Sequence, residues 1–172
     1  TAIGATAKTT SQMNTQSTFT DAGWNFISIW GIHGNRNSGY PYLFWQSVAP
    51  ITQACDLCYA SDESGKLDLT WTRGNGDGNV VFVCEDITGA AEPIDNVHYN
   101  ANTHFGSGDQ IGTTGWYCVY DGDGSSVSVT GLRASTDYRV HVCEYNLGSI
   151  YYNTETATNN PATCESPIAI DL

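Results

Sequence analysis

The sequence predicts an all-β protein: a β-sandwich preceded by an aromatic-rich β segment and an extended N-terminal arm. Its 172 residues include 18 Gly, 10 Tyr and 5 Trp, while the residues that usually fill helices are scarce. From residue 50 onward, short apolar segments are separated by turns rich in Gly, Asn and Asp. About seven short strands at this spacing are typical of a β-sandwich.

Composition divides the chain into four regions. Residues 1–18 are small and polar with no helical period, so we expect an extended arm. Residues 19–49 concentrate aromatic and β-branched residues and predict a β segment whose rings are covered by another domain or another chain. Residues 50–160 are the expected sandwich, and residues 161–172 are the expected C-terminal tail.

The strands of the sandwich follow from local patterns. Residues 67–72 alternate and place Leu67, Leu69 and Trp71 on one face, whereas residues 79–84 are continuously apolar, as in a central strand. In residues 138–143, His141 is expected to face outward between two inward valines. The remaining strands are expected at 116–120, at 126–130 and at the more polar 151–158.

Charge excludes two classes of partner. The chain has 6 Lys and Arg against 18 Asp and Glu, which gives a formal net charge of −12. Such a surface repels phosphate backbones and anionic lipid, so we expect no nucleic-acid partner. The sequence also has no apolar run near the roughly 20 residues of a membrane helix, so we expect no membrane insertion.

Six cysteines, an even number at wide spacing, predict structural disulfides in an oxidising compartment. A zinc site would need a second close Cys/His pair, and the sequence has only one close pair, Cys55 and Cys58. If this pair lies on a strand, its two sulfur atoms point to opposite faces, and each cysteine pairs elsewhere. Metal binding, redox chemistry and free thiols remain as alternatives. The disulfide candidates are Cys55, Cys58, Cys84, Cys118, Cys143 and Cys164.

Two sets of residues in the sandwich carry a family resemblance. Trp71, followed by Gly131-Leu132-Arg133-Ala134-Ser135-Thr136-Asp137-Tyr138, resembles the fibronectin type III domain, in which the Leu132 and Tyr138 positions form a corner that closes the sandwich. Residues 71–78, 105–112 and 144–146 resemble fibronectin III-like domains of large secreted surface proteins of Bacteroidetes-type bacteria. The resemblance implies an immunoglobulin-like, fibronectin III-like sandwich at a bacterial cell surface.

The resemblance also suggests how the cysteines pair. Cys84 and Cys143 lie on strands that are neighbours in the resembled fold, so this pair is the first expectation. Cys55 or Cys58 with Cys164 is the second, since those segments could meet. The resembled domains usually have other residues at these strand positions, so cross-linking would be an added property of this chain.

The first 45 residues carry a second resemblance. Lys8-Thr9-Thr10-Ser11-Gln12-Met13, Gly23-Trp24-Asn25-Phe26, Trp30-Gly31-Ile32 and Tyr40-Pro41-Tyr42-Leu43 resemble the closing segment that follows GLUG repeats in bacterial adhesins. Residues 166–172 resemble the linker before a type IX secretion sorting domain. Both resemblances imply a secreted protein.

The sequence predicts no enzyme. His98 and His104 lack the spacing of a compact metal-ligand set, and no nucleophile-elbow motif is present. Asp121 and Asp123 alternate with glycine, but their loop falls short of the twelve-residue calcium pattern. We therefore expect no catalytic or metal residue and no cofactor, with a Ca²⁺ ion as the one open alternative.

These observations predict a non-catalytic extracellular structural or adhesive protein that forms a homopolymer. An extended arm ahead of a β-sandwich can add a strand to the sheet of a neighbouring copy, and a contact that does not close on itself produces a fibre. The residues expected at the subunit contact are Ile3, Phe19, Trp24, Phe26 and Trp30.

The alternative is a carbohydrate-binding or adhesin module of a larger secreted protein. Aromatic rings exposed in loops can stack on sugars, and Tyr40, Tyr42 and Trp45 are the candidates. The same rings could instead pack the N-terminal segment onto the sandwich.

Overall fold

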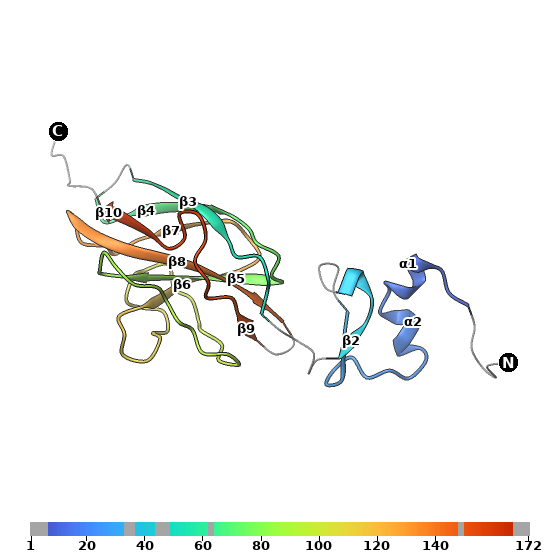
Figure 1. Ribbon diagram of the computed structural model, residues 1–172. Helices are drawn as coiled ribbons and strands as arrows, with labels where there is room; N and C mark the ends of the chain where they lie inside the picture. The colour runs from blue at the N-terminus through green and yellow to red at the C-terminus, as the bar shows by residue number, and fades with distance from the viewer. Residues whose placement is uncertain (1–6, 33–36, 44–48, 62–63, 148–149, 167–172) are drawn as a thin grey trace. The chain divides into compact units, whose positions relative to one another are not determined.

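The computed structural model describes residues 7–32, 37–43, 49–61, 64–147 and 150–166 (Figure 1). The chain forms two compact units, the N-terminal unit (residues 1–47) and the sandwich unit (residues 48–172), each described by itself below. Within the described residues, no helix has the length and apolar character needed to cross a membrane.

The N-terminal unit combines two short helices with a small β-ladder. Its elements are α1 (Thr10–Met13), α2 (Ser17–Thr20), β1 (Trp30–Gly31), the 3₁₀ turn η1 (Asn37–Gly39) and β2 (Tyr42–Leu43), which pairs antiparallel with β1.

Helix α1 replaces part of the expected extended arm. The Thr9 hydroxyl accepts a hydrogen bond from the Gln12 N–H, and the Gln12 side chain accepts one from the Thr9 N–H. This capping box satisfies two backbone donors that a short helix otherwise leaves open. The three-residue spacing of Thr9 and Gln12 is the local signal for this helix, although no apolar period accompanies it.

Aromatic rings build a core for the N-terminal unit. The buried Phe19 ring lies 4.9 Å from the Trp24 ring, centre to centre, and the Trp24 ring lies 4.2 Å from the Trp30 ring. The Tyr42 ring lies against Gly31, where an added Cβ would come within 2.5 Å of it. Part of the aromatic cluster is thus covered within the unit itself.

The sandwich unit has two antiparallel sheets that form separate layers in Figure 1. The first sheet consists, in spatial order, of β3 (Cys55–Ala60), β4 (Leu67–Thr72) and β7 (Ser126–Val129). The second consists of β10 (Ala162–Ser166), β8 (Thr136–Asn146), β5 (Gly78–Cys84) and β6 (Tyr117–Gly122), and β9 (Tyr151–Tyr152) pairs with the end of β8. The predicted all-β sandwich is confirmed.

The main core lies between the two sheets. Leu67, Leu69 and Trp71 point inward from β4, as their alternation predicted, and meet valines of β5 and β8. The Trp71 ring packs edge-on against the Tyr120 ring, with 5.5 Å between the ring centres. Alternation therefore identified the buried face of β4 correctly.

A second core covers the opposite face of β5. Val80 and Phe82 point away from the first sheet and pack against residues of the 32-residue segment between β5 and β6. This segment, residues 85–116, is called the covering loop, and the yellow-green chain beside β5 and β6 in Figure 1 is part of it. Burial on both faces explains why β5 is continuously apolar. The covering-loop residues in this core are Ala91, Tyr99, Ile111 and Trp116.

The C-terminal part of the sandwich differs from the expectation. The predicted strand 151–158 shortens to β9, and β10 lies within the expected tail, paired with β8. The buried Asn160 side chain accepts from the Val142 N–H and donates to the Val142 and Ala54 carbonyls. These bonds hold the entry to β10 against both sheets, so the sandwich continues to Ser166.

Candidate functional site

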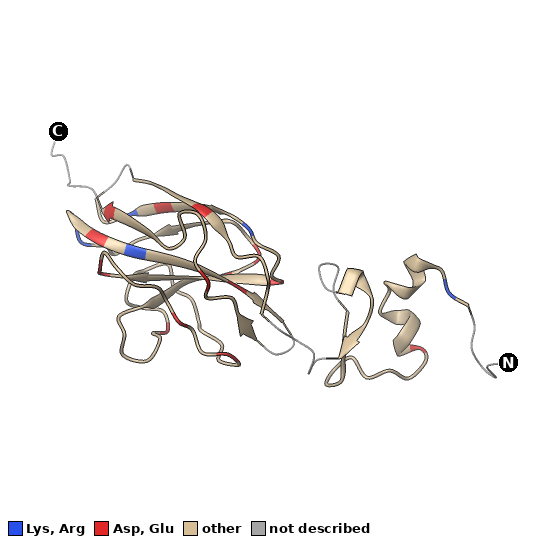
Figure 2. Cartoon of the chain, in the orientation of Figure 1, with Lys and Arg blue, Asp and Glu red and all other residues tan. Residues whose placement is uncertain are grey.

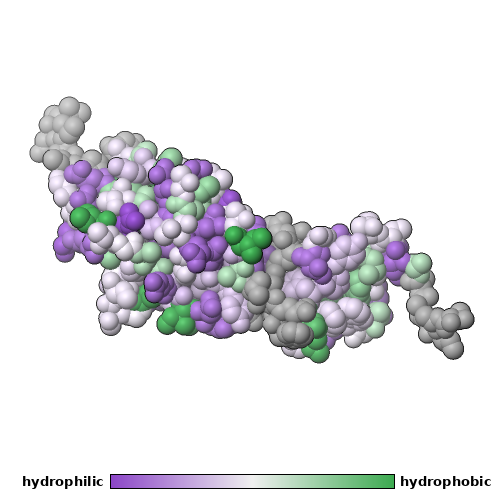
Figure 3. Space-filling view, in the orientation of Figure 1, coloured by the Kyte–Doolittle hydropathy of each residue, from purple (hydrophilic) through white to green (hydrophobic). Residues whose placement is uncertain are grey.

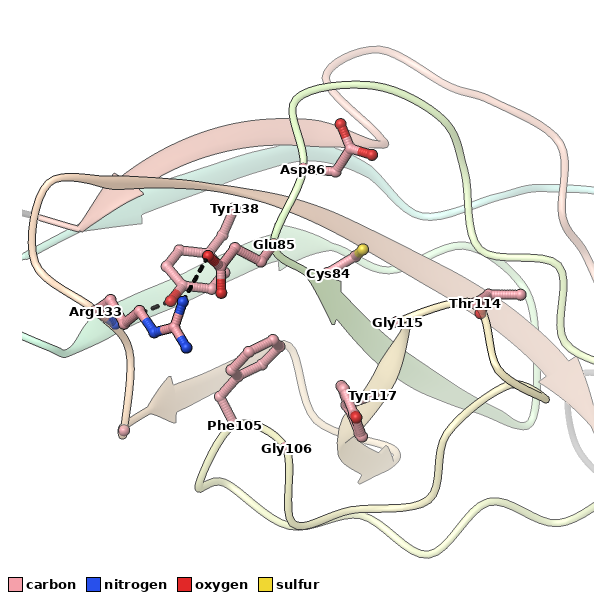
Figure 4. A pocket seen from close by; sticks show the side chains of 11 residues that line it. Cys84, Glu85, Asp86, Phe105, Gly106, Thr114, Gly115, Tyr117, Arg133 and Tyr138 are labelled. Carbon is pink, nitrogen blue, oxygen red and sulfur yellow. Dashed lines mark hydrogen bonds and ion pairs between the residues drawn. The ribbon is translucent and has the colours of Figure 1, made fainter.

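A pocket of about 510 Å³ opens at one end of the sandwich, where the covering loop, the start of β6 and the β7–β8 turn meet (Figure 4). We call it the end pocket. Its lining residues are Cys84, Glu85, Asp86, Phe105, Gly106, Thr114, Gly115, Tyr117, Gly131, Arg133 and Tyr138.

Three aromatic rings form one wall of the end pocket. The partly exposed Phe105 ring packs edge-on between Tyr117, at 5.4 Å, and Tyr138, at 5.1 Å between ring centres. Tyr138 is fully buried, and its hydroxyl accepts a 2.9 Å hydrogen bond from the Arg133 N–H. Burial raises the pKa of Tyr138, so the hydroxyl stays protonated at neutral pH.

Trp71, Leu132 and Tyr138, the three predicted core and corner residues, all lie in the core between the sheets. The bond from the Arg133 N–H to the Tyr138 hydroxyl joins the β7–β8 turn to β8. It thereby fixes the backbone on which the Arg133 side chain stands beside the end pocket.

Charged side chains stand at the rim of the end pocket. Arg133 Nη1 lies 3.2 Å from Glu85 Oε1, and both side chains are substantially exposed. Asp86 accepts hydrogen bonds from the Ile87 and Thr88 N–H groups, which lower the pKa of its carboxyl. Burial raises the pKa of the Cys84 thiol, so it is protonated rather than a nucleophilic thiolate. The end pocket therefore offers binding groups and no activated nucleophile.

A second hollow, of about 530 Å³, lies where the outermost strands of the two sheets meet, β3 and β10. We call it the edge groove. Each of these strands has one edge without a strand partner among the described residues, and such edges can accept an added strand. Its lining residues are Leu57, Cys58, Tyr59, Arg139, Asn159, Pro161, Ala162 and Thr163.

Two segments that carried the family resemblance meet through a buried ion pair. The Glu144 carboxylate, fully buried in β8, accepts from Arg73 Nε at 2.8 Å and from the Gly74 and Gly76 N–H groups. This contact raises the pKa of Arg73. The pair organises the turn between β4 and β5, which is a structural role.

All six cysteines lie in described residues and are free thiols. The expected Cys84–Cys143 bridge is wrong, because Cys84 lies opposite Arg139 and Cys143 lies opposite Val80. That register separates them by four residues, roughly 13 Å along the strands, beyond the reach of a disulfide.

The second expected pairing does not form either. Cys164 points into the core between the sheets, while Cys58 is exposed and Cys55 is partly exposed. Burial raises the pKa of the Cys118 and Cys164 thiols to about 12. Cys118 and Cys143 lie in the second core, and burial raises the pKa of Cys143 as well. The cysteines therefore serve mainly as small buried side chains.

The sequence predicted that His141 faces outward, away from the core between the sheets. In the structure this side chain is fully buried, because the covering loop packs over that face of β8. Its Nδ1 lies 3.0 Å from the Ala91 N of the covering loop. Burial lowers the pKa of His141 to about 4, against the opposing effect of backbone hydrogen bonds. Among the described residues, no group of three His, Cys, Asp or Glu side chains is placed to hold a metal ion.

The residues expected at the subunit contact separate into buried and exposed ones. Phe19 is buried and Phe26 and Trp30 are partly buried, whereas Trp24 is exposed. Two isoleucines that the sequence analysis did not select, Ile27 and Ile29, are also exposed. Ile3 lies outside the described residues.

Two of the residues expected to stack on sugars, Tyr40 and Tyr42, lie in the described part of the chain. Tyr40 and Tyr42 are partly buried, and Tyr42 packs on Gly31. Trp45 lies outside the described residues. The aromatic residues of the end pocket, Phe105 and Tyr117, were missed because neither stands in an aromatic-rich loop of the sequence.

The comparisons with known proteins concern the sandwich. No family model matches the chain, and a search of curated proteins finds no match. Among solved structures, the chain is similar to the FN5 domain of Drosophila Lar, with 14% identity over 72% of this chain and 99% of that one and a TM-score of 0.40. It is also similar to the fn3 domain of the human collagen alpha-1(XX) chain, with 17% identity over 74% of this chain and 92% of the collagen domain, and with a TM-score of 0.43. Domains A168–A170 of titin are similar with 13% identity, over 71% of this chain and 34% of the titin chain, and with a TM-score of 0.43.

Proposed function

We propose that this is a non-catalytic structural or adhesive protein, secreted to a bacterial surface, whose N-terminal unit joins copies into a fibre. The observation that carries the proposal is that three apolar side chains of that unit are exposed; Figure 3 shows separate hydrophobic side chains at the surfaces of both units. The exposed fraction is 94% for Ile27, 48% for Ile29 and 37% for Trp24. Neighbouring apolar side chains left exposed on a small unit are typical of a protein contact surface.

The charge distribution favours a second copy of this chain as the partner. Residues 1–47 contain two basic residues and one acidic residue, whereas residues 48–172 contain four basic and 17 acidic residues. In Figure 2 acidic positions are spread over the sandwich unit and are sparse on the N-terminal unit. Two sandwich surfaces repel each other, but a nearly neutral N-terminal unit can approach a sandwich without that penalty. This supports a head-to-tail contact, the arrangement that extends into a filament when it does not close.

The edge groove is the acceptor that suits this contact. Leu57, Pro161 and Ala162 provide apolar lining, and the free edges of β3 and β10 provide backbone donors and acceptors. An incoming segment that pairs with either edge gains main-chain hydrogen bonds and places alternate side chains in the groove.

The proposal is tested by light scattering and electron microscopy of the whole protein over a range of concentrations. The unsubstituted protein is expected to form filaments, and Ile27→Asp and Ile29→Asp are expected to shift it to monomers, because each buries a charge in the apolar contact. Ile94→Asp is the matched control, since Ile94 is 60% exposed on the sandwich unit. A protein that is monomeric at every concentration, or filaments that tolerate both N-terminal substitutions, would contradict the proposal.

A further inference from the structure

We infer that the end pocket binds one uncharged sugar unit of a glycan. This location is not the one predicted from the sequence, because the end pocket contains none of Tyr40, Tyr42 and Trp45. All of its lining residues belong to the sandwich unit, so sugar binding here does not depend on self-assembly. Figure 4 shows its two parts: the rings of Phe105 and Tyr117 inside the pocket and the Glu85–Arg133 pair beside them.

The rings provide an apolar surface that is ordered before a ligand arrives. Phe105 is held edge-on between Tyr117 and the fully buried Tyr138, and its N–H donates to the Thr130 carbonyl at 2.9 Å. Phe105 and Tyr117 nevertheless remain partly exposed. A sugar has an apolar face of C–H groups, and a fixed ring can cover such a face with little loss of side-chain entropy.

The Glu85–Arg133 pair provides an acceptor and a donor side by side. The Glu85 carboxylate only accepts hydrogen bonds, the guanidinium only donates them, and the pair uses Nη1 of Arg133. Adjacent sugar hydroxyls can each donate and accept, so one hydroxyl fits the carboxylate and its neighbour fits the guanidinium. Hydrogen bonds to charged groups are stronger than those between neutral groups.

Charge and size restrict the ligand further. Asp86 adds a second carboxylate to the rim, and the sandwich unit is strongly acidic, so an anionic sugar is disfavoured. The protonated Cys84 thiol offers no covalent chemistry. A volume of about 510 Å³ falls within the range of roughly 300–1,000 Å³ that small-molecule sites occupy.

The test is saturation-transfer NMR of the whole protein with four neutral probes: methyl β-D-glucoside, methyl β-D-galactoside, methyl α-D-mannoside and the methyl glycoside of N-acetylglucosamine. At least one probe is expected to bind. Arg133→Ala is expected to lower the affinity for that probe by about tenfold, which corresponds to the loss of one hydrogen bond to a charged group. Lys66→Ala is the matched control, because Lys66 is also a cation paired with a carboxylate at the surface, and it is expected to leave binding unchanged.

Three results would overturn the inference. The first is no saturation transfer from any of the four probes, and the second is equal binding by Arg133→Ala and the unsubstituted protein. The third is tighter binding of methyl glucuronide, an anionic sugar, than of methyl glucoside. Since Arg133 is mostly exposed, its variant is expected to fold, and far-ultraviolet circular dichroism checks this. Loss of binding in Tyr40→Ala with full binding in Arg133→Ala would place the sugar on the N-terminal unit instead.

Discussion

At the scale of single residues, buried polar groups show how the sandwich is held. His141 and Glu144 lie three residues apart on β8, and each accepts hydrogen bonds from the backbone of a segment that has no regular structure of its own. Glu144 fixes the turn before β5, and His141 fixes the covering loop after it. These two buried polar side chains therefore each hold a loop in position.

The buried His141 predicts a pH dependence of stability. Its pKa is about 4 in the folded protein and 6.5 when exposed, so the unfolded chain binds the proton more readily between these values. The free energy of unfolding should therefore fall as pH decreases from 6.5 toward 4, by at most about 3 kcal/mol. Urea unfolding at several pH values measures this.

His141→Asn provides the control for this pH effect. The asparagine amide oxygen can accept the Ala91 N–H bond but does not titrate. The loss of stability between pH 6.5 and pH 5, where most carboxylates remain ionised, should therefore be smaller in the variant. Equal slopes in the two proteins would show that His141 is not the titrating group.

At the scale of elements, the covering loop turns an ordinary sandwich sheet into one that is buried on both faces. The loop contains only turns and isolated bridges, and it is tied to β6 by bonds from the Asn102 N–H to the Cys118 carbonyl and from the Cys118 N–H to the Asp109 carbonyl. It also contributes Phe105 to the end pocket. The second core and the proposed sugar site thus depend on the same segment.

At Gly108 the backbone of the covering loop lies so close to β6 that there is no space for a side chain. A Cβ at Gly108 would overlap the Cys118 carbonyl oxygen, which is backbone and cannot turn away. We expect Gly108→Ala to lower the free energy of unfolding by about 2–4 kcal/mol, because the loop must move off the sheet. Hydrogen exchange of residues 85–116 should increase, and urea unfolding should show the loss.

Gly106→Ala is the control for Gly108→Ala. Gly106 has a φ of +82°, but an added Cβ would meet nothing within 4 Å, so the cost is the backbone strain of about 1 kcal/mol. If both variants lose the same stability, the close approach at Gly108 is not the cause.

At the scale of the whole molecule, charge is distributed unevenly between the two units. The sandwich unit carries a formal charge of −13 and the N-terminal unit a charge of +1, which together give the net charge of −12. The exposed apolar side chains of the N-terminal unit stand on a part of the chain that carries little charge. Assembly would therefore combine an apolar contact with repulsion between acidic sandwiches.

This balance predicts the direction of the salt effect on assembly. Raising NaCl from about 20 mM to about 500 mM shortens the screening length several-fold, so repulsion between copies decreases while the apolar contact remains. We expect longer or more numerous filaments at high salt, measured by light scattering. Assembly that weakens with salt would instead indicate contacts dominated by ion pairs between copies.

The sequence predicted the sandwich because its signals are local. Alternation in Leu67–Thr72 and the apolar run before Cys84 show which faces of a strand are buried, and Gly-rich turns mark where strands end. The corner residues Leu132 and Tyr138 were selected from the resemblance to fibronectin type III domains, and both lie in the core. These features require only the neighbouring residues along the chain.

The end pocket could not be predicted in the same way. Glu85 and Phe105 come from distant parts of the covering loop, Tyr117 from β6 and Arg133 from the β7–β8 turn, and no common spacing links them. Between residues 85 and 115 the covering loop has no period of 2 or 3.6 residues, so nothing marked Tyr99 and Ile111 as core residues. Their burial depends on the sheet beneath them.

By itself, the sequence determined the all-β class, the inward face of β4, the central position of β5 and the acidity of the sandwich unit. Only the tertiary structure decided the register that separates Cys84 from Cys143, the addition of β10 and the two cores on either side of β5. The physical reason is that side-chain periodicity records whether a residue faces solvent or core. Which distant segment fills that core depends on how strands pair and how loops pack across the whole chain.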